Sequence, residues 1–393
     1  MTVVTAPSLG SSREPQLPRR RVLVLTVVHN PSDSRIWFRE VDALLTSGWH
    51  VTYVAPFSGY NQAPPVRDAR LPGSLTCLDI TRAEGRRRAR ADRAARGLLK
   101  RLARHHDLVM VHDPELLVAA AGLRLRNLVW DVHEDASAAL QVKEWMPKAF
   151  RPAVAALWSA AEHQAERSFD LLLAEFAYQQ RFRRRHPVIP NTVPVPSETV
   201  PPGRDRVVYV GTVTEARGCQ LMIAVGRALA ALPSPVRLEI IGDAPQQKSA
   251  EALHQAERAG ILTWRGFLPS HAALSRMSGA LAGLSLLDDL PNFRCSLPTK
   301  VVEYGAFGIP VITTPLPLAA QHVRAANSGL IVPWRDPDAV VRAVVALRDD
   351  PDRAAVLGRN GHATALEHYN WWTWSRRFVH EMELLADRAD LVS

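Results

Sequence analysis

Two successive series of alternating apolar and amphipathic segments constrain the fold of this chain more than any other feature. The first series has apolar runs at 21–28, 50–56, 107–113, 127–135 and 169–175, and the second has them at 206–213, 236–243, 261–267, 281–287, 309–314 and 329–334. Short continuous apolar runs are typical of buried parallel strands, and strands that alternate with helices predict a doubly wound α/β sheet. The proline-rich stretch 188–196 separates the two series, so we expect two such sheets joined by a linker.

The length of the chain agrees with this division. Its 393 residues are enough for two or three domains. Residues 1–19 are polar and rich in Pro and Ser, which predicts a disordered leader. We expect an N-terminal Rossmann-like lobe at 20–190 and a C-terminal one at 203–364. Ligands of such sheets bind outside the carboxyl ends of the strands, so the predicted site lies in the cleft between the lobes.

The formal charge is +9, and of the 48 basic residues only five are lysine. An arginine-favouring genome explains this composition, and so does a preference for anionic partners such as nucleotide diphosphates or acidic lipids. The basic run 86–104 is predicted to form a helix. It is either a solvated helix face or a peripheral contact with an anionic membrane.

The cysteines and the hydropathy pattern bear on the compartment. No run of about 18 apolar residues predicts a spanning helix, and the N-terminus lacks the basic-then-apolar order of a signal peptide. Cys77, Cys219 and Cys295 are far apart and form no C-x-x-C pair, which argues against a zinc site or a disulfide framework. We therefore expect a reduced, cytoplasmic setting, with contact to the inner membrane face as the alternative.

The segment 296–314, SLPTKVVEYGAFGIPVITT, carries the sharpest functional signal. Thr299, after Pro298, is predicted to be the N-cap of a helix that ends at Gly308. The unpaired N–H groups and the dipole of a helix N-terminus favour a diphosphate. Glu303, one turn into the helix, can accept hydrogen bonds from a ribose diol. The alternative is an exposed or capping glutamate.

This segment resembles the donor-site signature of family 4 glycosyltransferases, the large retaining GT-B group. The usual signature is E-x7-E followed by a small-residue helix end and G-x-P-V-I, and Glu303 with the residues after it matches the second half. The first Glu of the signature falls at Cys295. One branch of the family carries S-x-P-x-K-x-x-E-Y instead, and this form is matched by Ser296, Pro298, Lys300, Glu303 and Tyr304, with Leu297 and Pro298 in the place of the usual F-G pair.

A second segment, VVYVGTVTEARGCQLMI (207–223), resembles the strand–glycine–[KR]-G–helix segment of the same family. Gly211 allows a close approach of the backbone to a ligand. Arg217 matches the residue that pairs with the donor diphosphate, because guanidinium geometry suits two phosphate oxygens. Thr212 stands where the family usually has an arginine, and Lys300 or Arg294 is the candidate replacement.

Further donor-side candidates come from the next two strand–loop units. LEIIGDAP (238–245) resembles the following strand and glycine turn of the family, with Gly242 at the turn. WRGFLPSHAAL (264–274) resembles the segment whose backbone reads the base. Its candidates are Gly266, Phe267 and Leu268, and the alternative for Phe267 is a core aromatic.

The N-terminal lobe supplies the catalytic candidates. HNPSDSRIWFRE (29–40) is similar to the H-x-x-D-S-R-I loop of one branch of family 4, which makes Asp33 and Arg35 candidates, although both can simply close a turn. VWDVHED (129–135) resembles the D-x-H-[ED] loop. His133 matches the histidine that contacts the transferred sugar, whereas a purely structural histidine is the alternative.

The resemblance implies a GT-B fold: two Rossmann-like doubly wound lobes that face a cleft, with C-terminal helices near 365–390 crossing back to the N-terminal lobe. It also implies a hexosyltransferase-type enzyme that uses a nucleotide-sugar, UDP-linked first and GDP-linked second, with retention. The expected acceptor is a small molecule or a lipid-linked glycan, and nucleic acid is not an expected partner.

We expect no cofactor and no metal requirement, because Asp288 and Asp289 adjoin without the spacer of a D-x-D site. Arg217, the helix dipole and backbone donors would then stabilise the leaving diphosphate. A UDP-sugar 2-epimerase and a catalytically altered pseudo-glycosyltransferase remain alternatives. A NAD-dependent dehydrogenase is disfavoured, because the loop after the first strand lacks the G-x-G-x-x-G glycines.

Overall fold

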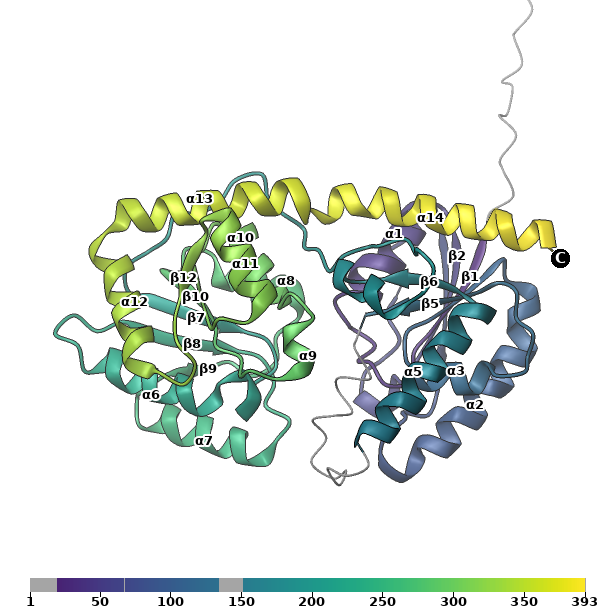
Figure 1. Cartoon of the computed structure of the whole chain (residues 1–393), viewed down its shortest axis with the longest axis horizontal. Coiled ribbons are helices and arrows are strands. Elements are labelled where there is room, and N and C mark those ends of the chain that lie inside the picture. Colours follow the sequence, from purple (N-terminus) through teal and green to yellow (C-terminus); the bar gives the residue numbers. More distant parts are fainter. Residues whose placement is uncertain (1–19, 67, 134–150, 393) are drawn as a thin grey trace, which may run out of the picture.

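The computed structural model describes residues 20–66, 68–133 and 151–392, and within these residues the chain forms two lobes (Figure 1). Each lobe is built on one six-stranded parallel sheet flanked by helices. The predicted α/β class with two Rossmann-like lobes is therefore confirmed. The predicted leader, residues 1–19, lies outside the described residues.

The N-terminal sheet has the strand order β3-β2-β1-β4-β5-β6. Its strands are β1 Arg21–Leu25, β2 His50–Ala55, β3 Ser74–Asp79, β4 Leu108–Val111, β5 Leu128–Val132 and β6 Asp170–Leu173. The central strands are the predicted apolar runs, and β4 and β5 are buried along their whole length. β3 was not predicted, because this edge strand has no apolar run and is partly exposed throughout. The order reverses between β1 and β4, where a crevice opens at the carboxyl ends.

The described helices of this lobe include a π-helix after β1. They are η1 Ile36–Val41, α1 Asp42–Thr46, η2 Ser58–Tyr60, η3 Gly85–Arg87, α2 Arg88–Leu102, η4 Ala103–His105, α3 Glu115–Ala120, α5 Arg151–Ser168 and η6 Phe176–Arg181. The basic run forms α2, whose apolar face is Ala91, Ala95 and Leu99, all fully buried. Because this face packs into the lobe, any contact of α2 with an anionic surface would rest on its basic side chains alone.

The C-terminal sheet repeats the same topology, in the order β12-β11-β10-β7-β8-β9. Its strands are β7 Arg206–Val210, β8 Arg237–Ile241, β9 Thr263–Trp264, β10 Ala282–Ser285, β11 Val311–Thr313 and β12 Gly329–Ile331. Its helices are η7 Glu215–Arg217, α6 Cys219–Ala230, α7 Gln247–Arg258, α8 Ser270–Met277, α9 Pro291–Arg294, α10 Thr299–Ala306, α11 Pro317–Ala326, α12 Pro337–Asp349 and α13 Pro351–His368. The strand order reverses between β7 and β10, and the crevice at this point faces the crevice of the N-terminal sheet.

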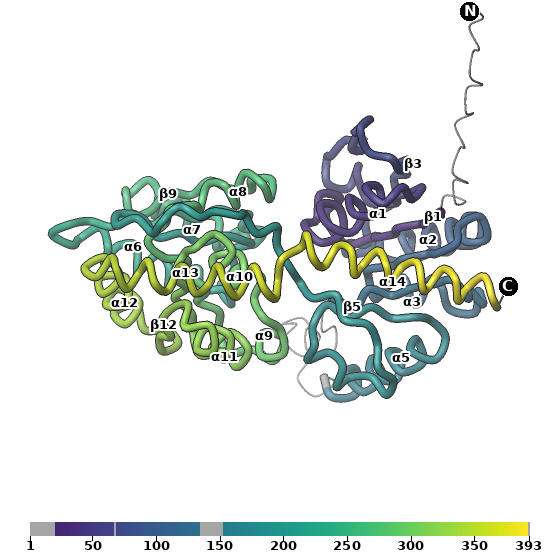
Figure 2. The backbone as a smooth tube through the Cα atoms, turned by 90° about the horizontal axis from the view of Figure 1, so that it is seen from above, coloured from purple at the N-terminus to yellow at the C-terminus, as the bar shows by residue number. Residues whose placement is uncertain are grey.

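The last helix, α14 Trp371–Val392, leaves the C-terminal lobe and packs on the N-terminal one (Figures 1 and 2). Its buried residues Trp371, Phe378 and Met382 join the core beneath β1, β2 and β4. Trp372, by contrast, is 61% exposed and does not take part in this packing. The predicted crossing of the C-terminal helices is confirmed.

The chain passes between the lobes twice, and the two passages are bonded to each other. In the linker, the Val193 N–H donates to the carbonyl of Tyr369 at 3.0 Å, and the Trp371 N–H donates back to the Val193 carbonyl at 2.8 Å. The linker and the α13–α14 junction thus form a short two-stranded connection. Within the described residues, no helix is long and apolar enough to cross a membrane.

Candidate functional site

The carboxyl ends of the two sheets face a shared cavity of about 500 Å³ between the lobes. Ser34, His133 and Glu175 line it from the N-terminal lobe, and Arg217 and Lys300 from the C-terminal one. The wall on the C-terminal side is also formed by Gly211, Thr212, Ser296, Leu297, Thr299 and Glu303. The structure therefore brings together most of the predicted donor residues and the predicted histidine.

Two glycines allow the loops after β7 and β8 to approach closely. Gly211 has a φ of +121°, and Gly242 has a φ of +147°. A Cβ on Gly242 would lie 2.0 Å from the carbonyl oxygen of Gly211, so any side chain there would clash with backbone. Gly242 thus allows the loop that carries Gly211 to pack closely against it. Gly242 itself is not among the described residues that line the cavity.

Lys300 and Arg217 make the C-terminal wall of the cavity positive. Lys300 is only 8% exposed, and its Nζ lies 3.4 Å from the Tyr209 hydroxyl, above the ring of Tyr209. Burial, together with the charge of Arg217, lowers the pKa of Lys300 to about 7, and Glu303 partly opposes this shift. A buried amine with a lowered pKa regains its charge when an anion binds beside it. This wall can therefore hold a diphosphate.

Helix α10 points its first turn into the same cavity. It begins at Thr299, and Pro298 is the N-cap, so the predicted capping role of Thr299 is wrong. No side chain among the described residues caps this end, which leaves backbone N–H groups for a ligand. Glu303 lies one turn further on. Burial raises the pKa of Glu303, while Arg39 of the N-terminal lobe and Lys300 lower it in part.

His133 stands on the N-terminal wall with both ring nitrogens engaged. Its Nδ1 lies 3.1 Å from Asp131 Oδ2, and its Nε2 lies 2.9 Å from His29 Nε2. His29 in turn directs its Nδ1 to Asp113 Oδ1 at 2.5 Å, and Asp113 also accepts from the Thr26 hydroxyl at 2.9 Å. Aspartates therefore hold both histidines in fixed ring orientations at the edge of the cavity.

Arg35 is buried behind His133 and does not line the described cavity. It donates two hydrogen bonds to Asp131, at 2.7 and 2.8 Å, and its Nε lies 3.0 Å from Glu40 Oε1. Burial by itself would lower the pKa of Arg35, but Asp131 and Glu40 raise it overall. The structure thus places Arg35 as the counter-ion of two buried carboxylates. From the sequence alone, an arginine in this loop that pairs with buried carboxylates cannot be distinguished from one that contacts the substrate.

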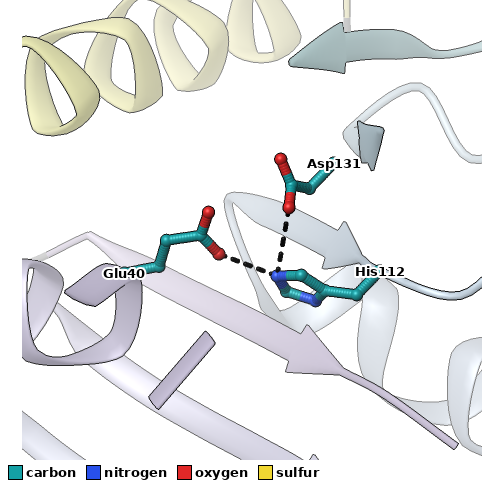
Figure 3. Close-up of side chains that lie close together, drawn as sticks. All are labelled: Glu40, His112 and Asp131. Atoms are coloured by element: carbon teal, nitrogen blue, oxygen red, sulfur yellow. Dashed lines mark hydrogen bonds and ion pairs between the residues drawn. The ribbon is translucent and has the colours of Figure 1, made fainter. Parts of the chain in front are cut away.

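Glu40, His112 and Asp131 lie close together, and Figure 3 shows their side chains converging. His112 Nε2 lies 2.8 Å from Glu40 Oε2 and 4.0 Å from Asp131 Oδ2. Such a set of ligand atoms is compatible with a metal ion. However, Arg35 pairs with both carboxylates, and Glu40 and Asp131 raise the pKa of His112 despite its burial, so we assign the cluster as a buried ion-pair network.

Asp33, the other candidate of the first loop, organises the backbone. Its Oδ1 accepts hydrogen bonds from the N–H groups of Arg35 and Ile36, at 2.8 and 3.0 Å, where η1 begins. Burial opposes ionisation, but His29 and these backbone donors hold the pKa of Asp33 below its usual value. Its neighbour Ser34 is the residue of this loop that lines the cavity.

Four other predicted donor residues lie outside the described lining of the cavity. Gly266 accepts a hydrogen bond from the Gly242 N–H at 2.8 Å and so borders the same edge of the sheet. Phe267 is 57% exposed, which excludes the alternative of a core aromatic, and Leu268 packs on a core cluster. Arg294 makes two bonds of 2.6 Å to Asp289 on the surface. Lys300 is thus the better placed replacement for the charge missing at Thr212.

Sequence reasoning missed Glu175 and Asn191, which line the cavity from the N-terminal lobe. Burial raises the pKa of Glu175 to about 7, while Asn191, Arg35 and the backbone N–H of Leu297 in the other lobe lower it in part. The signal for it was an acidic residue directly after the buried run FDLLLA, at the end of a strand that faces the cleft.

Two Rossmann-like lobes that face a polar cavity, with a C-terminal helix returning to the first lobe, define the GT-B class of fold. Residues 204–350 match a family model described as glycosyl transferases group 1. This part of the chain is therefore similar to that family, in agreement with the resemblance in the sequence.

The curated relatives and solved structures agree with this assignment. A GDP-mannose-dependent α-(1-6)-phosphatidylinositol monomannoside mannosyltransferase of Mycolicibacterium smegmatis is 29% identical over 198 residues, which is 48% of this chain and 49% of that protein. The chain spans about half the length of the curated relatives that it matches.

Two solved structures share the whole fold. Sucrose-phosphate synthase from Thermosynechococcus elongatus has a TM-score of 0.72 at 18% identity and covers 95% of this chain and 100% of its own. Anabaena HepE, solved with UDP and glucose, has a TM-score of 0.67 at 14% identity, with 93% and 100% covered.

Proposed function

We propose that the protein transfers a sugar from a nucleoside-diphosphate donor to an acceptor, with retention and without a metal ion. The observation that carries this proposal is the convergence of Arg217, Lys300 and the open N-terminus of α10 on one cavity between the lobes. Positive side chains and a helix N-terminus together suit a diphosphate. Retention is what the resemblance to family 4 glycosyltransferases implies.

In this proposal the C-terminal wall binds the donor and stabilises the leaving group. The charge that develops on the diphosphate would be met by Arg217, by a recharged Lys300 and by the N–H groups of α10, all positioned before the reaction begins. Glu303 would accept hydrogen bonds from the ribose of the nucleotide. His133, on the opposite wall, would face the transferred sugar.

We propose UDP-sugars as the first class of donor and GDP-sugars as the second. The similarity to HepE, which was solved with UDP, supports the first choice. The relative from Mycolicibacterium smegmatis, whose name states a GDP-mannose dependence, supports the second. That relative acts on a phosphatidylinositol mannoside, which favours a lipid-linked glycan over a small-molecule acceptor, and the exposed arginines of α2 suit an anionic lipid surface.

A catalytically altered, pseudo-glycosyltransferase role is the second candidate, and one observation favours it. Cys295, at the position of the first Glu of the family signature, turns its Sγ toward the carbonyls of Pro291 and Asn292, at 3.5 and 3.7 Å. It is not in the described lining of the cavity. A protein of this kind would bind the nucleotide without transferring the sugar. A 2-epimerase would instead convert the donor without any acceptor.

The first experiment is a thermal-shift screen against UDP-, GDP- and dTDP-sugars, since a bound ligand stabilises the folded state. Turnover of the donor that binds is then followed with and without candidate acceptors, which separates a transferase from an epimerase. We expect Arg217→Ala and Glu303→Ala each to reduce turnover at least about tenfold. Arg258→Ala, at an exposed arginine of α7, is the matched control. Unchanged kinetics in both variants would contradict the site.

A further inference from the structure

Glu175 brings a carboxylate into the cavity from the lobe opposite the predicted diphosphate site. It follows β6 by two residues and has an extended backbone, with φ −143° and ψ 139°, just before η6. The residue is 9% exposed and lines the cavity. The end of a buried strand therefore fixes its place, so the carboxylate is a rigid part of the wall.

The neighbours of Glu175 place it beside the donor loop. Asn191 of its own lobe and Leu297 of the other lobe line the same cavity, and both lower the pKa of the Glu175 carboxyl group in part. Leu297 lies two residues before the start of α10, on the loop that leads into the predicted diphosphate site. An ionised carboxylate has about four lone-pair positions, so it can accept from further donors in the cavity.

The charges around Glu175 indicate what kind of group it can bind. Arg217 and Lys300 are on the other wall, and Arg35, behind the cavity, is bonded to Asp131. A carboxylate repels phosphate, so its ligand is not the diphosphate. A buried carboxylate gains most from O–H or N–H donors, and burial raises its pKa to about 7. Neutral hydroxyl groups are the donors that a sugar offers.

The other carboxylate in the cavity is less well placed than Glu175 to bind a sugar hydroxyl group. Among the described lining residues, the carboxylates are Glu175 and Glu303. Glu303 lies in the second turn of α10, past Lys300, on the C-terminal lobe. Glu175 lines the cavity from the N-terminal lobe, just before η6. The two carboxylates thus come from different lobes.

We propose that Glu175 accepts a hydrogen bond from a hydroxyl group of the transferred sugar, and that it helps to determine which sugar the donor site takes. This inference rests on the proposed function. The hydroxyl donates to the carboxylate, and no covalent bond is made or broken by Glu175. The N-terminal lobe therefore reads the sugar that the C-terminal lobe holds by its diphosphate.

The test compares the binding of UDP and GDP with that of UDP-glucose and GDP-mannose by titration calorimetry. Glu175→Gln keeps the shape of the side chain and an acceptor for the Leu297 N–H but removes the charge. We expect its affinity for the nucleoside diphosphate to stay within about twofold of wild type, and its affinity for the nucleotide-sugar to fall about tenfold. Glu198→Gln, the same change at an exposed position, is the control.

Donors that lack single hydroxyl groups then identify the contact. For the wild type, removal of one particular hydroxyl should weaken binding about tenfold, and for Glu175→Gln the same removal should cost little, because the interaction is already lost. If Glu175→Gln does not fold, Glu175→Asp, which keeps the charge on a shorter side chain, replaces it and should weaken the same hydroxyl contact.

The outcomes separate this inference from the proposed function. A wild type that binds UDP-glucose or GDP-mannose better than the bare diphosphate, with an equal gain in Glu175→Gln, overturns the inference alone. A wild type that binds neither the diphosphates nor the nucleotide-sugars overturns both. Equal sensitivity of wild type and variant to every missing hydroxyl also contradicts the role of Glu175.

Discussion

His29 Nε2 lies 2.9 Å from His133 Nε2, while the Nδ1 atom of each ring faces an aspartate. Although burial opposes it, the pKa values of Asp113 and Asp131 are lowered, so both are ionised acceptors and each Nδ1 carries a hydrogen. The contact between the two Nε2 atoms links the two rings, so His29 orients the ring of His133.

We expect His29→Ala to lower kcat about tenfold with little effect on the KM of the donor, because His133 loses the partner of its Nε2. The measurement is steady-state kinetics of sugar transfer. In a double-mutant cycle with His133→Ala, the two losses should be less than additive, since both act through one ring. His105→Ala, at an exposed histidine, is the control. Fully additive losses of kcat would show that His29 does not act through His133.

Arg35→Met should destabilise the protein by about 3–5 kcal/mol, because it leaves Asp131 and Glu40 buried without their counter-ion. Urea unfolding at pH 7 measures this difference. The matched change Arg70→Met breaks an exposed pair with Asp68, in which the Arg70 side chain is 89% exposed, and should change the stability little, because water and salt screen such a pair. Equal losses in the two variants would argue against the buried network.

Binding of UDP or GDP at about pH 8 should take up protons, because the pKa of Lys300 is about 7 in the free protein and an adjacent diphosphate raises it. Calorimetric titrations in buffers of different ionisation enthalpy measure the number of protons. In Lys300→Met the uptake should vanish and the affinity should fall at least about tenfold. Uptake that persists in the variant would assign the titrating group elsewhere.

Stability should fall as the solution is acidified below about pH 4. The pKa values of Asp33, Asp113 and Asp131 are lower in the folded protein than their ordinary values, despite the opposing effect of burial. Their contribution is present above the unfolded pKa and is lost as pH falls through the folded pKa, because the unfolded chain binds protons more tightly. Urea midpoints from pH 7 to pH 3 test this, and Asp113→Asn should flatten the curve.

The topology could be predicted because its signals are local. The apolar runs of β1 and β7 give these strands in sequence order, and Gly211 gives the turn after β7. The strand β3 could not be predicted in the same way, because an edge strand with partly exposed residues has neither an apolar run nor a strict alternation. Likewise, the predicted cap at Thr299 failed by one residue, since Pro298 occupies the N-cap.

The site could be predicted where one segment carries both position and chemistry, as with Lys300 and Glu303 on α10. It could not be predicted where the role depends on a partner distant in sequence. Arg35 reads as a cleft residue until Asp131 is brought against it. Glu175 reads as the end of a strand until Leu297 arrives from the other lobe. Such pairings arise only from the three-dimensional packing.

The bonded passages at Val193 and Tyr369 have a mechanical consequence. If the lobes pivot about this point, neither passage has to lengthen, and the α14 helix moves as part of the N-terminal lobe to which its core residues belong. The chain thus leaves the N-terminal lobe through the linker and returns to it with α14. A single cut in the linker would leave the N-terminal lobe joined to the rest of the chain only by the packing of α14 in its core.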